Sequence, residues 1–103
     1  MNELRNGKYR EHETFKWYKD GKLHREDGPA VIWDSGHKEW YQNGVLHRED
    51  GPAFEGKNGG QAWFLKGVQY TEEEFKKWES KKFLNEKLHS TLKEKPGGRK
   101  VKI

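Results

Sequence analysis

Short hydrophobic runs alternate with polar, glycine-containing turns along the first seventy positions of the chain. The runs are three to five residues long and rich in aromatic and β-branched residues, which is typical of strands. Asp-Gly at positions 20–21 and Asn-Gly at positions 43–44 favour two-residue hairpin turns, because glycine tolerates positive φ. We therefore predict antiparallel strands at residues 15–19, 22–25, 30–33, 53–55, 61–65 and 68–70.

One stretch of this pattern occurs twice. Residues 17–30 (the first copy) and residues 40–53 (the second copy) agree at 11 of 14 positions across an offset of 23 residues, and a shorter match occurs at residues 63–67. A fixed period of this size is typical of repeat architectures, in which neighbouring units share a core. We predict an elongated antiparallel sheet of 23-residue hairpin units over residues 15–70, preceded by a degraded unit or N-terminal cap over residues 1–14.

The periodicity changes after residue 70. Thr71 and the glutamates directly after it form a capping box, which indicates a helix start. Phe75 and Trp78 form one apolar stripe, and a second stripe lies about 180° away at 100° per residue. Its members are Leu84, Leu88 and Leu92. We expect a helical region over residues 71–95 with a kink or break near residues 80–82, hence one kinked or two short helices. The alternative is one long helix that is buried on two faces.

The predicted fold is mainly β with C-terminal α (α+β). With 103 residues, of which 30% are hydrophobic and 37% charged, the chain cannot build a large core, but its 14% aromatic content argues against disorder. It contains no cysteine and no apolar run long enough for a signal peptide or a membrane helix. We therefore expect a cytoplasmic protein that binds no membrane.

Charge is distributed unevenly along the chain. Residues 1–70 contain 11 Lys/Arg and 11 Asp/Glu, whereas residues 71–103 contain 10 Lys/Arg and 6 Asp/Glu. The net charge of +4 therefore comes entirely from the last third, which ends in a basic tail over residues 96–103.

The repeated unit combines Trp-Tyr-x-x-Gly, a His-containing return strand, Asp-Gly-Pro-Ala and a later glycine. It resembles the MORN repeat, and more closely the divergent His-Arg-Glu-Asp-Gly-Pro-Ala repeats of tailed-phage, giant-virus and some bacterial proteins. The resemblance covers about residues 15–70, and residues 70–75 look like the C-terminal cap of short phage members. It implies an elongated antiparallel sheet and an interaction module, and it transfers no binding residue. Ordinary MORN units carry Gly where this chain has Arg25 or Ala30.

The repeated His-Arg-Glu-Asp sequence has three interpretations. Imidazoles and carboxylates could bind zinc, but a closed site needs convergent geometry. They could also act as an acid–base pair, although catalysis normally uses one asymmetric constellation in a pocket. We favour ladders in which these side chains pair across neighbouring hairpins. The protein is then no enzyme, with no cofactor or metal, and its candidate partner-binding residues are His24, Arg25, Glu26, Asp27, His47, Arg48, Glu49 and Asp50.

Trp17, Trp40 and Trp63 occupy the same position of the pattern. Aromatic residues on a sheet can stack on single-stranded bases. We favour instead a core stripe that joins the units, because residues 15–70 lack the excess positive charge that phosphate binding requires.

The basic last third is the better nucleic-acid candidate, because clustered Lys and Arg attract phosphates through counterion release. The competing interpretation is a solvated helix face with a solubilising tail. The candidate residues are Lys76, Lys77, Lys81, Lys82, Lys95, Arg99, Lys100 and Lys102.

These observations support three hypotheses for function. The first is a non-catalytic, phage-type protein that inhibits a host defence complex, such as a nuclease, a toxin or a CRISPR-like effector, by protein–protein contact. The second is an RNA- or DNA-binding protein that uses the basic helix and tail and that could inhibit a ribonucleoprotein or a toxin through RNA. The third is an antitoxin-like structural homodimer with a helix–helix seam at the leucines of the second apolar stripe.

Overall fold

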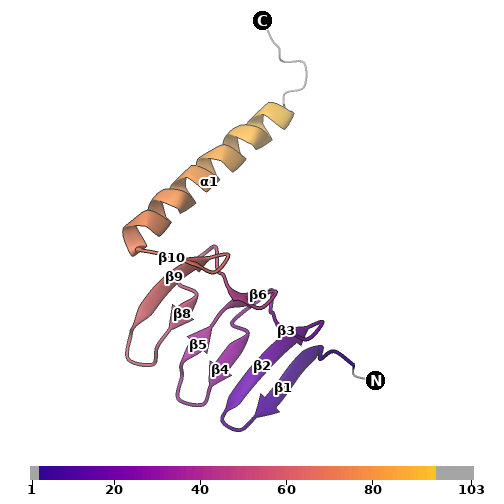
Figure 1. Cartoon of the computed structure of the whole chain (residues 1–103). Helices are drawn as coiled ribbons and strands as arrows, with labels where there is room; N and C mark the ends of the chain where they lie inside the picture. Colours follow the sequence, from indigo (N-terminus) through magenta and orange to yellow (C-terminus); the bar gives the residue numbers. More distant parts are fainter. Residues whose placement is uncertain (1–2, 95–103) are drawn as a thin grey trace, which may run out of the picture. The chain divides into compact units, whose positions relative to one another are not determined.

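Ten short strands and one helix make up the part of the chain that the computed structural model describes, residues 3–94 (Figure 1). The chain divides into two units, of which the first ends at Glu72 and the second begins at Glu73. The first contains all the strands and the second consists of the helix from Glu73 onward. The expected mainly β fold with C-terminal α structure is therefore confirmed at this level.

The elements succeed one another along the sequence with short connections. The strands are β1 (Gly7–Glu11), β2 (Thr14–Lys19), β3 (Lys22–Leu23), β4 (Val31–Trp33), β5 (Lys38–Glu39), β6 (Tyr41–Gln42), β7 (Val45–Leu46), β8 (Phe54–Glu55), β9 (Gln61–Leu65) and β10 (Val68–Tyr70), and the helix is α1 (Glu72–Glu94).

Every strand pair is antiparallel, and the strand order matches the sequence order. An eight-stranded sheet has the order β1-β2-β4-β5-β8-β9-β10, with β3 paired to β2, and β6 and β7 form a separate two-stranded sheet. Both β3 and β4 pair with β2: Leu23 is opposite Tyr18, and Ile32 is opposite Phe15. Figure 1 shows this progression as a continuous change of colour from β1 to β10.

The predicted strands are present with shifted ends. Residues 61–65 and 68–70 form β9 and β10 as expected, whereas the strand predicted at 22–25 stops at Leu23. The His24 N–H still donates to the Trp17 carbonyl on β2 at 2.9 Å, whereas the Arg25 N–H donates to the carbonyl of Tyr41, beyond the hairpin, at 3.2 Å. Strand β1 pairs with β2 along its whole length, although its polar sequence did not predict a strand.

Two enclosed alanines lie directly before β4 and β8. Ala30 and Ala53 are both fully buried. The Ala30 carbonyl accepts from the Trp17 N–H at 2.8 Å, and its own N–H donates to the Glu39 carbonyl at 2.8 Å. Ala53 accepts from the Trp40 N–H at 2.8 Å and donates to the Ala62 carbonyl at 2.9 Å. Alanine suits both positions because the backbone is bonded on both sides and the side chain is enclosed.

Three of the hairpins end in a turn with two left-handed residues. At 20–21, 43–44 and 66–67 both residues have positive φ, with glycine second, as a type I′ turn requires. The Gly44 N–H donates to the Leu23 carbonyl and the Gly67 N–H to the Leu46 carbonyl, both at 2.8 Å. Each of these two turns is thereby bonded to the preceding hairpin.

The helix differs from its prediction. It begins at Glu72, directly after Thr71, and continues without interruption to Glu94, so the expected break near residues 80–82 is wrong. Residues 80–82 are Ser-Lys-Lys and contain no proline or glycine that would break the backbone hydrogen bonds. The second apolar stripe is not turned toward a core, since Leu84 and Leu88 are exposed, while Phe75 of the first stripe is only 2% exposed. No helix in the described part of the chain is both long and apolar enough to cross a bilayer.

Candidate contact surface

The histidine of the first copy links two hairpins. The Asn43 N–H, in the next hairpin turn, donates to His24 Nδ1 at 2.9 Å, and His24 Nε2 lies 2.8 Å from the Glu26 carboxylate. Because Nδ1 accepts, the neutral ring carries its proton on Nε2 and donates it to Glu26. The side chain of His24 is only 6% exposed. This histidine is therefore held inside the structure.

The second copy makes the same link. The Lys66 N–H donates to His47 Nδ1 at 2.8 Å, and His47 Nε2 lies 3.2 Å from Glu49. The side chain of His47 is 15% exposed, more than that of His24. The residues of both contacts lie 23 positions after their counterparts in the first copy, which is the offset of the sequence match.

An asparagine takes the place of the histidine before the first copy. The Asp20 N–H donates to Asn6 Oδ1 at 2.9 Å, and the Gly21 N–H donates to the Arg5 carbonyl at 2.9 Å. Residues 5–6 thus give the first turn the two acceptors that Leu23 and His24 give the second. The sequence only weakly indicated that Asn6 accepts from the first turn, because an Asn-Gly pair at 6–7 also predicts an ordinary turn.

The two arginines lie against tryptophan rings. Arg25 Cζ is 3.8 Å from the centroid of the Trp17 ring, and Arg48 Cζ is 3.9 Å from that of Trp40. Arg25 donates from Nε to Asp27 at 3.0 Å and from Nη1 to the Pro29 carbonyl at 3.1 Å. Such stacking suits the planar guanidinium and would not be reproduced by lysine.

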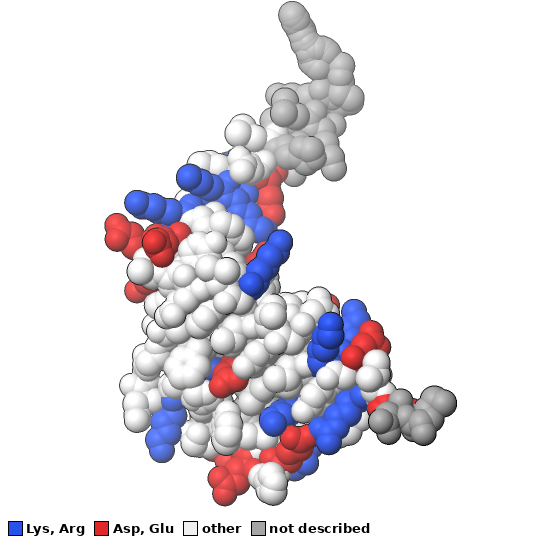
Figure 2. Space-filling view, in the orientation of Figure 1, with Lys and Arg blue, Asp and Glu red and all other residues white. Residues whose placement is uncertain are grey.

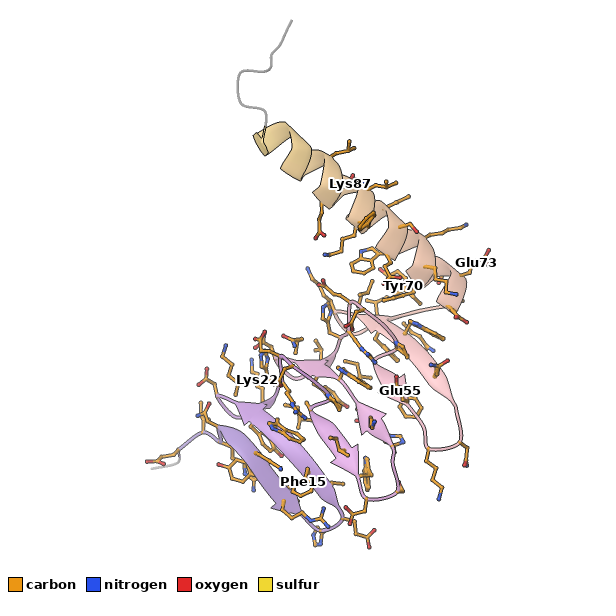
Figure 3. All side chains as sticks on the ribbon, turned by 180° about the vertical axis from the view of Figure 1, so that it is seen from behind. Phe15, Lys22, Glu55, Tyr70, Glu73 and Lys87 are labelled. Atoms are coloured by element: carbon orange, nitrogen blue, oxygen red, sulfur yellow. The ribbon has the colours of Figure 1, made fainter. Side chains whose placement is uncertain are left out.

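Arg48 repeats these contacts and adds one. It donates to Asp50 at 2.8 Å and to the Pro52 carbonyl at 3.0 Å, and its Nη1 is 3.2 Å from Glu55, labelled on β8 in Figure 3. A side chain at Gly51 would place its Cβ 3.0 Å from Arg48 Cζ, and the same distance separates a Cβ at Gly28 from Arg25 Cζ. The glycine of Asp-Gly-Pro-Ala therefore leaves room for the stacked arginine.

The carboxylates of the repeated sequence point to solvent. We call Glu26, Asp27, Glu49 and Asp50 the acidic surface; their side chains are 49% to 86% exposed. Each is bonded to the His or Arg two residues earlier in its own copy. The predicted side-chain ladder across hairpins is thus corrected: the link between hairpins runs from a backbone N–H to the His ring, and the ion pairs are local.

Trp17, Trp40 and Trp63 are half-buried, and an arginine covers one ring face of the first two. That face of Trp17 and Trp40 is closed to a stacking base. Trp63 differs, because the position that matches Arg25 and Arg48 is occupied by Thr71.

The histidines and carboxylates do not form a metal-binding cluster within the described residues. Among these side chains, no group of three or more His, Asp or Glu is arranged to hold a metal ion. His24 and His47 each pair with a glutamate of their own copy and do not converge on a common centre.

The structure describes four of the basic candidates, all on α1. Lys76, Lys77 and Lys81 are exposed, and Lys82 pairs with Glu86. Both colours appear on the helix in Figure 2, so its basic residues are interspersed with acidic ones. The remaining candidates, Lys95, Arg99, Lys100 and Lys102, and the predicted tail lie outside the described residues.

One tyrosine has an altered acidity. Burial, and then the hydrogen bond of 2.9 Å to the Glu39 carboxylate, raise the pKa of Tyr41 to about 12. Glu39 also bonds to His37 Nε2 at 2.8 Å. Tyr41 is therefore a neutral hydrogen-bond donor over the whole physiological pH range.

Comparison of the chain with protein-family models, with curated proteins and with solved structures found no match.

Proposed function

We propose that this protein is a non-catalytic binding protein that recognises a basic surface of a protein partner through Glu26, Asp27, Glu49 and Asp50. The observation that carries the proposal is the division of roles inside each copy. Histidine and arginine are engaged within the sheet, and the carboxylates beside them face solvent.

Rigid attachment strengthens this proposal. Asp27 is bonded to an arginine that stacks on Trp17, and Asp50 to one that stacks on Trp40. A charged group that is already fixed in place loses little conformational entropy on binding. Equivalent strands two positions apart in a sheet are separated by about 10 Å, so the two carboxylate pairs suit a partner with two cationic groups at a similar distance.

Negative charge also limits the choice of partner. Exposed carboxylates repel phosphates, so this surface favours a basic protein over a nucleic acid. The narrower proposal is a phage-type inhibitor of a host nuclease, toxin or CRISPR-like effector, whose own nucleic-acid-binding surface would be basic. That narrower proposal is supported by the resemblance of the repeated sequence and by this match of charge.

The test compares two variants with equal change of net charge. One carries Glu26→Gln, Asp27→Asn, Glu49→Gln and Asp50→Asn, which keep the acceptor oxygens for His and Arg but remove the negative charge. The control carries Glu3→Gln, Glu13→Gln, Asp20→Asn and Glu73→Gln, all at exposed positions outside the acidic surface. Both variants are used, with the unmodified protein, to capture partners from host lysate with and without nuclease treatment.

We expect the unmodified protein and the control to recover the same partner, and the first variant to lose it. Equal recovery by both variants would reject the acidic surface as the contact. Recovery of nucleic acid alone, lost on nuclease treatment, would reject protein recognition altogether.

The second candidate function is nucleic-acid binding through α1, which the exposed Lys76, Lys77 and Lys81 favour. It predicts that Lys76→Gln, Lys77→Gln and Lys81→Gln together weaken RNA or DNA binding and flatten its salt dependence by about three phosphate contacts. A salt dependence equal to that of the unmodified protein would remove this candidate.

A further inference from the structure

The hairpin turns at 20–21, 43–44 and 66–67, here called the first, second and third turn, are each tied to an earlier segment of the chain by two N–H groups. The glycine N–H of each turn donates to a backbone carbonyl of that segment at 2.8 to 2.9 Å. The residue before the glycine donates its N–H to a side chain, which is Asn6 at the first turn, His24 at the second and His47 at the third. The three turns therefore share one bond and differ in the chemistry of the second acceptor.

These acceptors respond differently to protons. An amide oxygen accepts a hydrogen bond at any physiological pH, whereas an imidazole nitrogen accepts only while it carries no proton. A histidine side chain ordinarily changes its charge between about pH 5 and pH 8, and its protonated ring has a donor at both nitrogens. The bonds from the Asn43 N–H to His24 Nδ1 and from the Lys66 N–H to His47 Nδ1 are then lost, because a donor would face a donor.

A carboxylate is placed at the other nitrogen of each ring. His24 Nε2 lies 2.8 Å from Glu26, and His47 Nε2 lies 3.2 Å from Glu49. An opposite charge at such a distance favours the charged form of a ring, and burial opposes it. The contact with the glutamate is kept when the ring is protonated, since Nε2 is a donor in both forms. Only the contact with the next turn is given up.

A lysine lies at each of the two turns. Lys22, labelled in Figure 3, has its Cβ 3.7 Å from the place that a Cβ on Gly44 would occupy. Val45 holds the matching place beside Gly67, where Lys66 is itself a turn residue. The arginine directly after each histidine is directed to a tryptophan and an aspartate. Positive charge at the turns disfavours an imidazolium that remains close to them, and so adds to the loss of the bond.

We propose that acidification loosens the second and third turns by protonating His24 and His47 at Nδ1, while the first turn keeps both of its bonds. The ladder inside each hairpin is unaffected, because β2 pairs with β3, β6 with β7 and β9 with β10 through backbone groups alone. What weakens is the tie between one hairpin and the next, of which the glycine bond remains. This pH-sensitive device is separate from the proposed partner contact, because it operates in the protein alone.

The device is tested by amide hydrogen exchange of the whole chain, resolved by NMR, between about pH 7.5 and about pH 5. The rate expected of an unstructured chain at the same pH, divided by the measured rate, gives the protection factor of each amide. The protection of the Asn43 and Lys66 amides should fall as the pH is lowered, by up to about tenfold per pH unit, the limit for one coupled proton. The Asp20 amide, which is bonded to Asn6, should keep its protection.

Two variants separate the links, because an amide side chain holds the first turn. His24→Asn should abolish the pH dependence at Asn43 and leave it at Lys66, and His47→Asn should do the reverse. The imidazole nitrogen signals of the unmodified protein show when each ring gains its proton. Rings that stay neutral at the lowest pH, constant protection at either amide, an equal fall at Asp20, or unchanged pH dependence in the asparagine variants would each overturn the proposal.

Discussion

The two copies of the fourteen-residue sequence make the same contacts in different surroundings. In each, a histidine accepts an N–H from the next hairpin turn, and an arginine stacks on a tryptophan and pairs with an aspartate. The copies differ in the residue two positions beyond their end. Ile32 occupies this position after the first copy and Glu55 after the second, and only Glu55 adds a bond to the arginine.

The comparison separates contacts that a copy makes alone from contacts that need a neighbour. The arginine stack and the arginine–aspartate pair are complete within one copy, whereas the histidine needs the next hairpin. That neighbour contributes a backbone N–H, which any residue except proline supplies. The turn can therefore vary in sequence, and the three positions at which the copies differ all lie there, at 19, 20 and 22 in the first copy.

The largest effect is expected at the buried alanines. Ala30→Leu and Ala53→Leu should each lower the free energy of unfolding by about 2 to 3 kcal/mol, because three extra carbons have no space between two bonded strands. Urea unfolding of both variants, with the exposed substitution Val68→Leu as control, measures this effect. A loss as small as that of the control at either alanine would show that the site is not closely packed.

The histidines come next and should differ from each other. His24→Ala should lower the free energy of unfolding by about 2 kcal/mol and His47→Ala by about 1 kcal/mol. Each substitution leaves a backbone N–H without its acceptor. The loss is larger at His24 because that side chain is more buried. His24→Asn should recover part of the loss, since Asn6 makes the corresponding bond in the unmodified chain. Urea unfolding measures all three variants, and equal losses for the two alanine variants would contradict the role of burial.

The arginines should show a smaller difference. Arg48→Met should cost about 1 kcal/mol in urea unfolding, and Arg25→Met somewhat less, because only Arg48 bonds to a second carboxylate. Glu55→Ile gives the second copy the residue found after the first, and in its presence the two arginine substitutions should cost the same. A difference that persists in the Glu55→Ile background would assign it to some other contact.

The smallest effect is confined to alkaline pH. The pKa of Tyr41 is raised to about 12 from its ordinary value of 10.0, so between these values the unfolded chain loses this proton first. The contribution of the neutral Tyr41 to stability is complete below pH 10 and is lost as pH rises through about 12. Urea unfolding of Tyr41→Phe and of the unmodified chain is measured between about pH 8 and about pH 11. As the pH rises, the free energy of unfolding of Tyr41→Phe should increase relative to that of the unmodified chain. A difference that stays constant over this range would contradict the raised pKa.

The strands and turns were largely predictable because their signals are local. A glycine as the second turn residue, between short hydrophobic runs, indicated the hairpins at 20–21, 43–44 and 66–67, and both residues of each turn have positive φ. Strand β1 was not predicted, because its residues are polar and its partner β2 supplies the ladder. The break in α1 was wrongly predicted because two apolar stripes were assumed to need burial, whereas one of them stays exposed.

The candidate residues were located by repetition, but their roles were not. Sequence alone could not show that Arg25 and Arg48 stack on tryptophans eight residues earlier, because that contact depends on how the chain turns back at Gly21 and Gly44. In each copy the His and Arg side chains lie against the sheet and the Glu and Asp side chains face solvent. This arrangement became evident only when the arginines were seen to stack on the tryptophans. Asn6 was missed because a single amide replaces a histidine there.

The most direct test of the contact surface is hydrogen exchange of the protein alone and in complex with its captured partner. We expect slower exchange on binding to be concentrated in the amides of residues 25–28 and 48–51, which carry the acidic surface. Slower exchange confined to α1, with both of these segments unchanged, would contradict recognition through the acidic surface.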